Sequence, residues 1–393
     1  MKSGGKRRAE KAPGSGVIWM LLIVLVATAL FASGCEDASA EPAEPVGDDR
    51  AGLPHDGIIE IRYPAGAPRV PWCEVEEPGI EEPEPPEPEP AAEDHGPSSG
   101  LPPNELGSVM VLMYHDIGGE EGEWRRTYDN FWGDLEYLWE NGYRPVTLAS
   151  YLSGDIDLPE GMTPVVLTFD DGLSSHLAWK DGEVGNPRPD TAVGMLLEFS
   201  AAHPGFDAHA AFYINSPRPF HPLPPEDVAE SLQWLVSEGF EIGNHTHYHA
   251  NLGNQSDEEV MRVIALTDAM ITGSVPGYRV QSLALPYGVL PRNRELAHCG
   301  VFDGIAYDYD AVLLVGAEPA PSPFSVRFAP LRLPRVRASS DELERWYAEM
   351  QRNPLLRYVS DGDPDTVAVP EAWVDRLDED ALGSRSVRWI EGE

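Results

Sequence analysis

Two short motifs contain the residue types that bind metal ions and move protons. Residues 168–172 read Thr-Phe-Asp-Asp-Gly, which places the adjacent carboxylates Asp170 and Asp171 after an apolar run. Further along the chain, His245 and His249 lie four positions apart. One carboxylate and two imidazoles form a three-ligand set that leaves a position open for water, and the spare carboxylate can accept that water's proton. The pair of motifs predicts a metal-dependent hydrolase.

The elements that must position these motifs alternate between apolar strands and amphipathic helices. Strands are expected at 109–113, 165–170, 208–214, 240–244, 282–286, 304–309 and 332–336. Helices are expected around 131–139, 192–197 and 228–236, and after a capping box that starts at Ser256. About seven strands alternating with helices predict an α/β fold, either a parallel barrel or a doubly wound sheet. In both folds the chemistry lies at the carboxyl ends of strands, where both motifs and residues 286–288 fall.

Separately, each motif has a more common structural explanation, because Asp-Asp-Gly is usually a turn and two histidines usually belong to the surface or the core. In combination and in this order, they resemble the NodB-type polysaccharide deacetylases, carbohydrate esterase family 4. The resemblance runs from about Ser108 to at least Val336. It includes residues 111–115, Val-Leu-Met-Tyr-His, which are similar to the subgroup that acts on exported poly-N-acetylglucosamine.

This resemblance implies a deformed (β/α) barrel of about seven parallel strands and removal of N-acetyl groups from N-acetylglucosamine-containing polysaccharide. It implies a divalent metal, with Zn²⁺ expected and Co²⁺, Ni²⁺ or Mn²⁺ as alternatives. The implied roles are general base for Asp170, metal ligands for Asp171, His245 and His249, loop support for Thr246, and substrate binding for Pro286 and Tyr287, with the Tyr287 backbone N–H holding the oxyanion. His247 is expected to face away from the metal.

The chain departs from the family pattern at two places. Ala284 stands where relatives carry an Arg that orients the base, so the orientation of Asp170 must come from elsewhere. A late Leu-x-x-His motif, which supplies the general acid, is missing, and residues 333–336 (Leu-Pro-Arg-Val) occupy its place. The general acid therefore stays open between His115 and His176, with His115 favoured because it follows the first strand.

The ends of the chain predict export and tethering. Lys2 to Lys11 form a basic segment, and 17–31 is an apolar run, too short for a membrane span but suited to a signal sequence. Cys35 follows small residues that resemble a bacterial lipobox and is the predicted lipidation site. Cleavage after Ala40 and an uncleaved anchor are the alternatives. All three place the body outside the cytoplasm, attached to a membrane or secreted.

The predicted domains are an export segment at 1–34, an acidic Pro/Glu-rich disordered tether at 35–104, a catalytic domain at 105–370 and a C-terminal tail at 371–393. Between Glu74 and Asp94 there are ten acids and no Lys or Arg, which favours a stiff, solvated spacer. Cys73 and Cys299 could pair in an oxidising compartment or remain thiols. Residues 357–364 are rich in turn formers and could rim the cleft.

Charge excludes one class of partner. The net charge of −38 leaves no basic footprint for DNA or RNA. Three functions stay open: the polysaccharide deacetylase, an O-acetyl esterase or small-amide hydrolase of the same superfamily, and a degenerate surface lipoprotein that only binds glycan. The missing Arg and the missing late His keep the third alternative open.

Overall fold

The computed structural model describes residues 94–316 and 318–391 of the 393-residue chain. The predicted export segment, Cys35, Cys73 and most of the predicted tether lie outside the described residues. From residue 94 the chain packs on the body: the Ser99 N–H donates to the Gly161 carbonyl at 3.0 Å.

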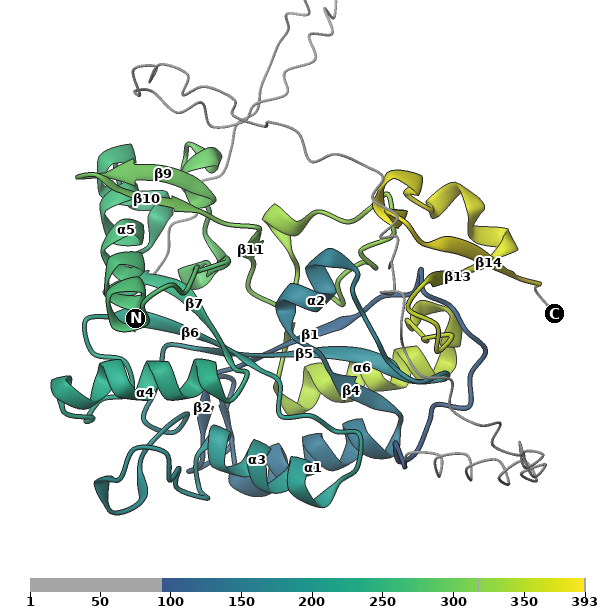
Figure 1. The fold of residues 1–393 in the computed structure, drawn as a ribbon, viewed down its shortest axis with the longest axis horizontal. Coiled ribbons are helices and arrows are strands. Elements are labelled where there is room, and N and C mark those ends of the chain that lie inside the picture. The colour runs from purple at the N-terminus through teal and green to yellow at the C-terminus, as the bar shows by residue number, and fades with distance from the viewer. Residues whose placement is uncertain (1–93, 317, 392–393) are drawn as a thin grey trace, which may run out of the picture. The chain divides into compact units, whose positions relative to one another are not determined.

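A parallel sheet curls into a deformed barrel and forms the centre of the molecule (Figure 1). Its strands are β1 (Met110–Tyr114), β4 (Tyr143–Pro145), β5 (Thr163–Asp170), β6 (Ala211–Ser216), β7 (Glu241–His247), β8 (Ser282–Ala284), β11 (Ala311–Leu313) and β12 (Val336–Arg337). The order is β11-β8-β7-β6-β5-β1-β12, with β4 paired to the start of β5. Every pairing is parallel, which confirms the predicted α/β barrel.

The two ends of this sheet are joined through the chain just before β12. Leu333 donates its N–H to Val312 and accepts from Leu314, both at 2.9 Å, so it extends the sheet beyond β11. Three residues later Val336 pairs with Leu112 of β1. This link brings the segment 333–337 to the same end of the barrel as β5.

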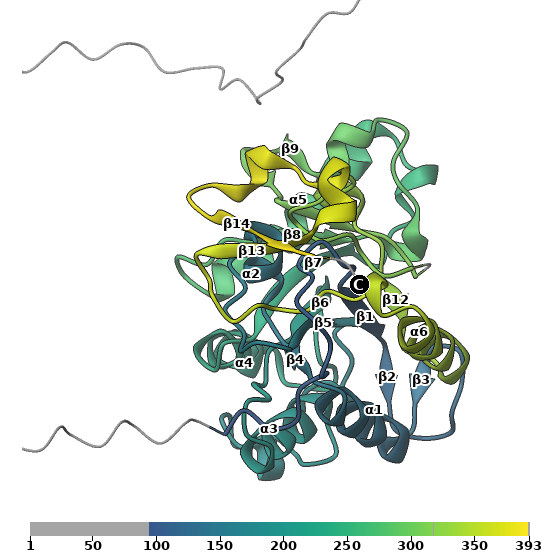
Figure 2. The same ribbon diagram turned by 90° about the vertical axis from the view of Figure 1, so that its right-hand side faces the viewer.

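In the part of the chain that the structure describes, six helices surround the barrel: α1 (Tyr128–Glu140), α2 (Leu148–Ser153), α3 (Ala192–Ala202), α4 (Pro225–Ser237), α5 (Asp257–Ser274) and α6 (Ser340–Arg352). Short 3₁₀ turns lie at Lys180–Gly182, Leu252–Asn254, Pro286–Gly288, Arg294–Ala297, Pro330–Arg332, Pro354–Leu356, Glu371–Arg376 and Glu379–Leu382. Ser256 caps α5 by accepting from the Glu259 N–H, which confirms the predicted helix start. Figure 2 shows α6 beside β12.

The core has two layers because side chains alternate along each strand. On β5, Val165, Leu167 and Phe169 face outward and pack against the helices. Val166 faces inward with the apolar residues that fill the barrel. By the same alternation Asp170 faces the barrel interior, where it is 1% exposed.

The structure corrects three strand predictions. Residues 304–309 are not a barrel strand: β10 (Ile305–Asp308) pairs antiparallel with β9 (Cys299–Phe302), and the fully buried β11 takes the barrel position. The predicted strand 332–336 is interrupted at Pro334, which lacks an N–H for the ladder, so β12 starts at Val336. Strand β4 was missed because three residues give too short a pattern.

The remaining strands lie outside the barrel. The short strands β2 (Asp116–Ile117) and β3 (Arg125–Arg126) follow β1 and pair with each other in parallel. The predicted tail contributes β14 (Ser386–Ile390), which pairs with β13 (Thr366–Pro370) and runs beside it in both views.

The segment 357–364 does not rim the cleft. It bridges Asn104 and Ser108 at the amino end of β1, which is the opposite end of the barrel from the Asp170 carboxylate. Across the two described ranges, no helix is both long enough and apolar enough to cross a lipid bilayer.

Candidate metal centre and active site

Three of the predicted ligands meet at the carboxyl ends of β5 and β7. The Asp171 Oδ1 lies 3.5 Å from His245 Nε2 and 3.5 Å from His249 Nε2. All three ligand atoms lie within 4.8 Å of one another. This spacing suits side chains that share one ion, and it leaves the solvent side open because Asp171 and His249 are half-exposed.

The hydrogen bonding of the His245 ring indicates that Asp171, His245 and His249 suit a cation. Its Nδ1 lies 2.8 Å from the Ala284 carbonyl, which can only accept, so Nδ1 carries the proton. In the neutral ring Nε2 then carries a lone pair and no proton, and this buried atom has no hydrogen-bond partner among the described residues. Because this lone pair faces the Asp171 carboxylate, a cation between the two atoms would be attracted by both. A second contact that fixes the ring in this way is typical of metal-ligating histidines.

The backbone around the ligands is held in the left-handed region, which non-glycine residues seldom adopt. Asp171 has φ 82°, Thr246 φ 63° and His249 φ 53°. Each such residue costs on the order of 1–3 kcal/mol, and such residues cluster at functional sites. The Thr246 hydroxyl accepts from the Ala250 N–H at 2.8 Å, and the Thr246 N–H donates to Asn244 Oδ1 at 2.7 Å. These bonds hold the bend that brings His249 back beside His245.

Asp170, the predicted base, is held by an arginine from the segment before β12, a strand that is separated from β5 by β1. Arg335 donates two parallel hydrogen bonds, Nη1 to Oδ1 and Nη2 to Oδ2, each 2.7 Å long. Arg335 is itself fully buried and also donates to the Leu314 carbonyl and to Thr168 Oγ1. Arg335 therefore orients the Asp170 carboxylate, a role for which the sequence motifs offered no residue. The arginine that relatives carry at the position of Ala284 is replaced here by one from the segment before β12.

These neighbours set the charge of both carboxylates. Burial alone would raise the pKa of Asp170, but the Arg335 guanidinium and His245 hold the pKa of that carboxyl well below its usual range. Burial also opposes ionisation of Asp171, and its contact with His245 lowers the pKa of that carboxyl. Both carboxylates are therefore ionised at neutral pH, which a base and a ligand each require.

The two candidate general acids occupy different environments. His176 is fully buried, accepts from the Leu173 N–H at Nδ1 and contacts the His115 carbonyl through Nε2 at 2.7 Å. Burial lowers its pKa to about 4. Both of its nitrogens are used inside the fold, so His176 is excluded as the acid. The His115 ring lies 4.8 Å from Trp124 and close enough to Asp170 and Asp171 for their charges to act on its pKa, which burial lowers.

Tyr287 and Pro286 lie in the turn after β8, beside the histidines. The Tyr287 ring packs edge-on against His249, with centroids 4.6 Å apart, and is 61% exposed. Its φ of 60° places another left-handed residue at the site. His247 lies outside the ligand group, with its ring against Tyr248.

The family comparison agrees with this geometry. A family model for polysaccharide deacetylase matches residues 158–300, which include Asp170, Asp171 and both ligand histidines. Residues 158–300 are therefore similar to the polysaccharide deacetylases. This match, together with the geometry of the site, supports a hydrolase. Arg335 lies beyond the matched stretch.

Solved structures similar to this chain come from several bacteria. The Streptococcus pyogenes deacetylase PplD, solved with acetate, is 16% identical, with a TM-score of 0.44 over 61% of this chain and 97% of that one. IcaB from Ammonifex degensii is 21% identical, with a TM-score of 0.45 over 62% and 97%. The polysaccharide deacetylase BC0361 from Bacillus cereus is 19% identical, with a TM-score of 0.45 over 62% and 69%. No curated protein matches the chain.

Sequence reasoning missed two residues of this deacetylase site. Arg335 lies on an expected apolar strand, and a charged residue within such a strand needs a buried partner, so a signal was present. Asn215 donates from Nδ2 to Asp171 Oδ1 at 3.3 Å, the same oxygen that faces both histidines. No motif marks Asn215, because only the pairing of β5 with β6 brings it there.

Proposed function

We propose that this polysaccharide deacetylase is a divalent-metal-dependent hydrolase that removes N-acetyl groups from N-acetylglucosamine-containing polysaccharide outside the cytoplasm. One observation carries the proposal: a three-ligand set formed by Asp171, His245 and His249 lies beside a buried, ionised carboxylate, Asp170. The ligands and the base come from the carboxyl ends of β5 and β7, the two strands that flank β6, and the carboxyl ends of barrel strands are where catalytic residues lie.

In this proposal Asp171, His245 and His249 hold the ion. When bound, a divalent ion polarises the acetamide carbonyl and lowers the pKa of water. Asp170 takes the proton from the attacking water on one of its oxygens. Arg335 fixes the plane of that carboxylate and keeps it ionised, so the base starts in the orientation and charge state that the step needs.

The second half of the reaction needs a donor for the oxyanion and a proton for the leaving amine. The Tyr287 backbone N–H is the proposed oxyanion donor, with Pro286 shaping the turn that presents it. His115 is the proposed acid, because its ring feels the charges of Asp170 and Asp171 whereas His176 is used elsewhere. The amine leaves protonated, and acetate is the second product.

Metal content and acetate release test the proposal together. The purified protein is expected to hold about one divalent ion per chain, Zn²⁺ being the expected ion, and to release acetate from N-acetylglucosamine oligomers. A chelator should abolish release, and adding Zn²⁺, Co²⁺, Ni²⁺ or Mn²⁺ should restore it. His249→Gln should lose the ion and the activity, whereas His247→Gln, two residues away, should keep both. Equal metal content in these two variants would refute the ligand set.

The same assay separates the alternative functions. An O-acetyl esterase would release acetate from acetylated xylan and not from N-acetylglucosamine oligomers. A protein that only binds glycan would bind sugar without metal and release no acetate. Arg335 removes one reason for that last alternative, because the base carboxylate has its guanidinium partner after all.

Export is proposed from the first 35 residues. The basic segment, the apolar run and Cys35 support a lipidated, membrane-attached form. Cys35→Ala should move the protein from the membrane fraction to the soluble extracytoplasmic fraction. A protein that stays with the membrane after this change would favour the uncleaved anchor.

A further inference from the structure

A buried hydrogen-bond network is attached to the strand that leads into the two proposed ligand histidines, and the chemistry described above does not use it. Its centre is Asn244, the fully buried residue of β7 that precedes His245. The Asn244 side chain donates from Nδ2 to Asp268 Oδ1 at 2.7 Å and to the Tyr309 hydroxyl at 2.9 Å. The Tyr309 hydroxyl donates to the same Asp268 oxygen at 2.6 Å, so the three side chains close a ring.

The network joins three elements that are separate in the sequence. Asp268 lies on α5, which packs against β7 and β10 (Figure 1), and Tyr309 lies between β10 and β11. Both side chains are almost completely buried. Burial raises the pKa of Asp268 from 3.8 to about 6 and raises the pKa of Tyr309 well above its usual value. At neutral pH Asp268 is therefore mainly an ionised acceptor, and Tyr309 keeps the proton that it donates.

The network fixes which end of the Asn244 amide faces the histidine motif. Asp268 Oδ1 and the Ile264 carbonyl, which lies 3.0 Å from Nδ2, can only accept, so they hold Nδ2 toward α5. The amide oxygen is left to face the Thr246 N–H, which donates to it at 2.7 Å. A reversed amide would place two donors against each other. Thr246, with φ 63°, is the left-handed residue at the start of the bend between the two histidines.

The bend at Thr246 links this network to the proposed metal centre. A left-handed residue other than glycine is strained, and it persists only where surrounding contacts hold it. The bond from the Thr246 N–H to Asn244 is one such contact, and it forms only when the amide oxygen faces the bend. We propose that Asp268 and Tyr309 are positioning residues: through Asn244 they hold the bend that presents the two histidines to one cation. This inference rests on the proposed function.

Co²⁺ binding to the metal-free full chain tests the proposal, because the visible absorption of bound Co²⁺ reports the geometry of its ligands. Asp268→Leu removes the acceptor at similar side-chain size, and Tyr309→Phe removes only a hydroxyl. Each should weaken Co²⁺ affinity by about ten-fold, the lower end of the effect of outer-shell partners, and should change the absorption spectrum. Asp268→Asn keeps an oxygen for Asn244 and should restore both. Acetate release at limiting Co²⁺ should fall in proportion to the bound metal.

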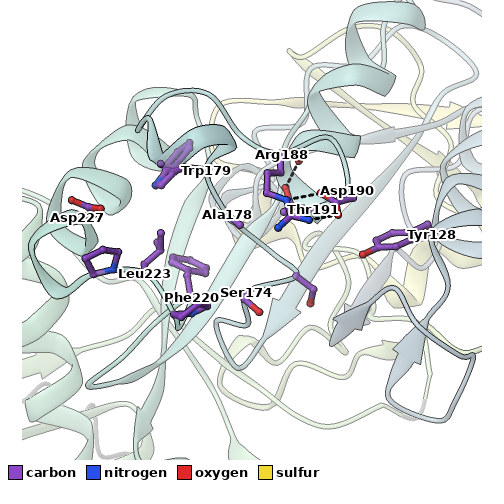
Figure 3. Close-up of a pocket in the computed structure, with 14 residues that line it drawn as sticks. Tyr128, Ser174, Ala178, Trp179, Arg188, Asp190, Thr191, Phe220, Leu223 and Asp227 are labelled. Carbon is purple, nitrogen blue, oxygen red and sulfur yellow. Dashed lines mark hydrogen bonds and ion pairs between the residues drawn. The ribbon is translucent and has the colours of Figure 1, made fainter.

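Tyr278→Phe is the matched control, because the Tyr278 hydroxyl also bonds β7. It accepts from the Ile242 N–H at 2.7 Å and donates to the Ile242 carbonyl at 3.0 Å, two residues before Asn244. Tyr278→Phe should leave the affinity and the spectrum of Co²⁺ unchanged. None of the substituted residues lines the groove of about 450 Å³ between the loops that follow β5 and β6 (Figure 3), so a fall in acetate release would not come from that groove.

The proposal is overturned if Asp268→Leu and Tyr309→Phe bind Co²⁺ with the affinity and spectrum of Tyr278→Phe. Failure of the proposed function looks different, because the unaltered protein would then bind no Co²⁺. In that event hydrogen exchange of the Thr246 N–H in the metal-free proteins still decides the role of the network. Exchange about ten-fold faster in Tyr309→Phe than in Tyr278→Phe, the size expected for one weakened hydrogen bond, supports it, and equal rates count against it.

Discussion

Two buried carboxylates at opposite ends of the barrel have opposite charge behaviour. Asp170, at the carboxyl end of β5, is paired with Arg335, which holds its pKa well below the usual range despite burial. Glu105, before the amino end of β1, accepts from the Ala368 N–H at 2.7 Å and from the Tyr358 hydroxyl at 3.0 Å. Burial raises the pKa of Glu105 from 4.5 to about 7, and the nearby Asp361 adds to the rise.

Both side chains are almost completely buried, so burial does not explain the difference. Neutral donors stabilise a carboxylate by less than a guanidinium that makes two charge-assisted bonds. The catalytic end of the barrel therefore holds a charge ready for chemistry. The opposite end uses its carboxylate to join the chain before β1 to β13.

The largest expected effect is on turnover. Asp170→Asn removes the proposed base and should lower kcat for acetate release by about 10²- to 10⁴-fold. The metal content should stay close to one ion per chain, because Asp171 and the histidines are intact. Glu105→Gln makes the same chemical change at the other end and should leave kcat nearly unchanged. If Asp170→Asn keeps its turnover, Asp170 is not the base.

Removing the Arg335 guanidinium should lower the stability of the fold. Arg335→Met leaves the Asp170 carboxylate buried without its partner, which should cost about 3–5 kcal/mol of unfolding free energy. Asp170→Asn combined with Arg335→Met should be less destabilised than Arg335→Met alone, because no unpaired charge remains. Urea unfolding of the two single variants and the double variant measures this coupling. Additive effects would show that the pair does not act as a unit.

This pair also marks the limit of what the sequence predicted. Asp170 and Asp171 were found because they are adjacent, and the histidines because they lie on one strand end at a fixed spacing. The alternation of strands and helices predicted a parallel barrel or a doubly wound sheet, and the family resemblance favoured the barrel. The partner of Asp170 lies 165 residues away, and those of Glu105 lie more than 250 residues away. Such contacts depend on which strand ends meet in the folded barrel, and a short sequence pattern does not specify this.

Glu105, at the opposite end of the barrel, should make the unfolding free energy depend on pH. Because folding raises the pKa of Glu105, the folded state binds the proton more tightly than the unfolded state. The stabilisation is complete below pH 4.5 and is lost as the pH rises through about 7. At about 1.4 kcal/mol per pKa unit, it amounts to at most roughly 3–4 kcal/mol.

Urea unfolding of the unaltered protein and of Glu105→Gln at pH values from about 3.5 to about 8, which spans the window between 4.5 and about 7, measures this effect. The unaltered protein should lose stability relative to Glu105→Gln as the pH rises. Glu371→Gln, at an exposed position, is the matched control and should follow the unaltered protein. A constant difference between Glu105→Gln and the unaltered protein would mean that Glu105 titrates alike in both states.

The smallest effect is expected where the same pairing lies in solvent. Arg279 makes two bonds to Asp310, Nη1 to Oδ2 at 2.6 Å and Nη2 to Oδ1 at 2.9 Å, which matches the geometry of the Arg335 pair. Both side chains are about half exposed, so water stabilises either charge when its partner is removed. Arg279→Gln should therefore change the unfolding free energy by less than about 1 kcal/mol and leave kcat unchanged. A loss as large as that of Arg335→Met would show that bidentate geometry, and not desolvation, gives the buried pair its strength.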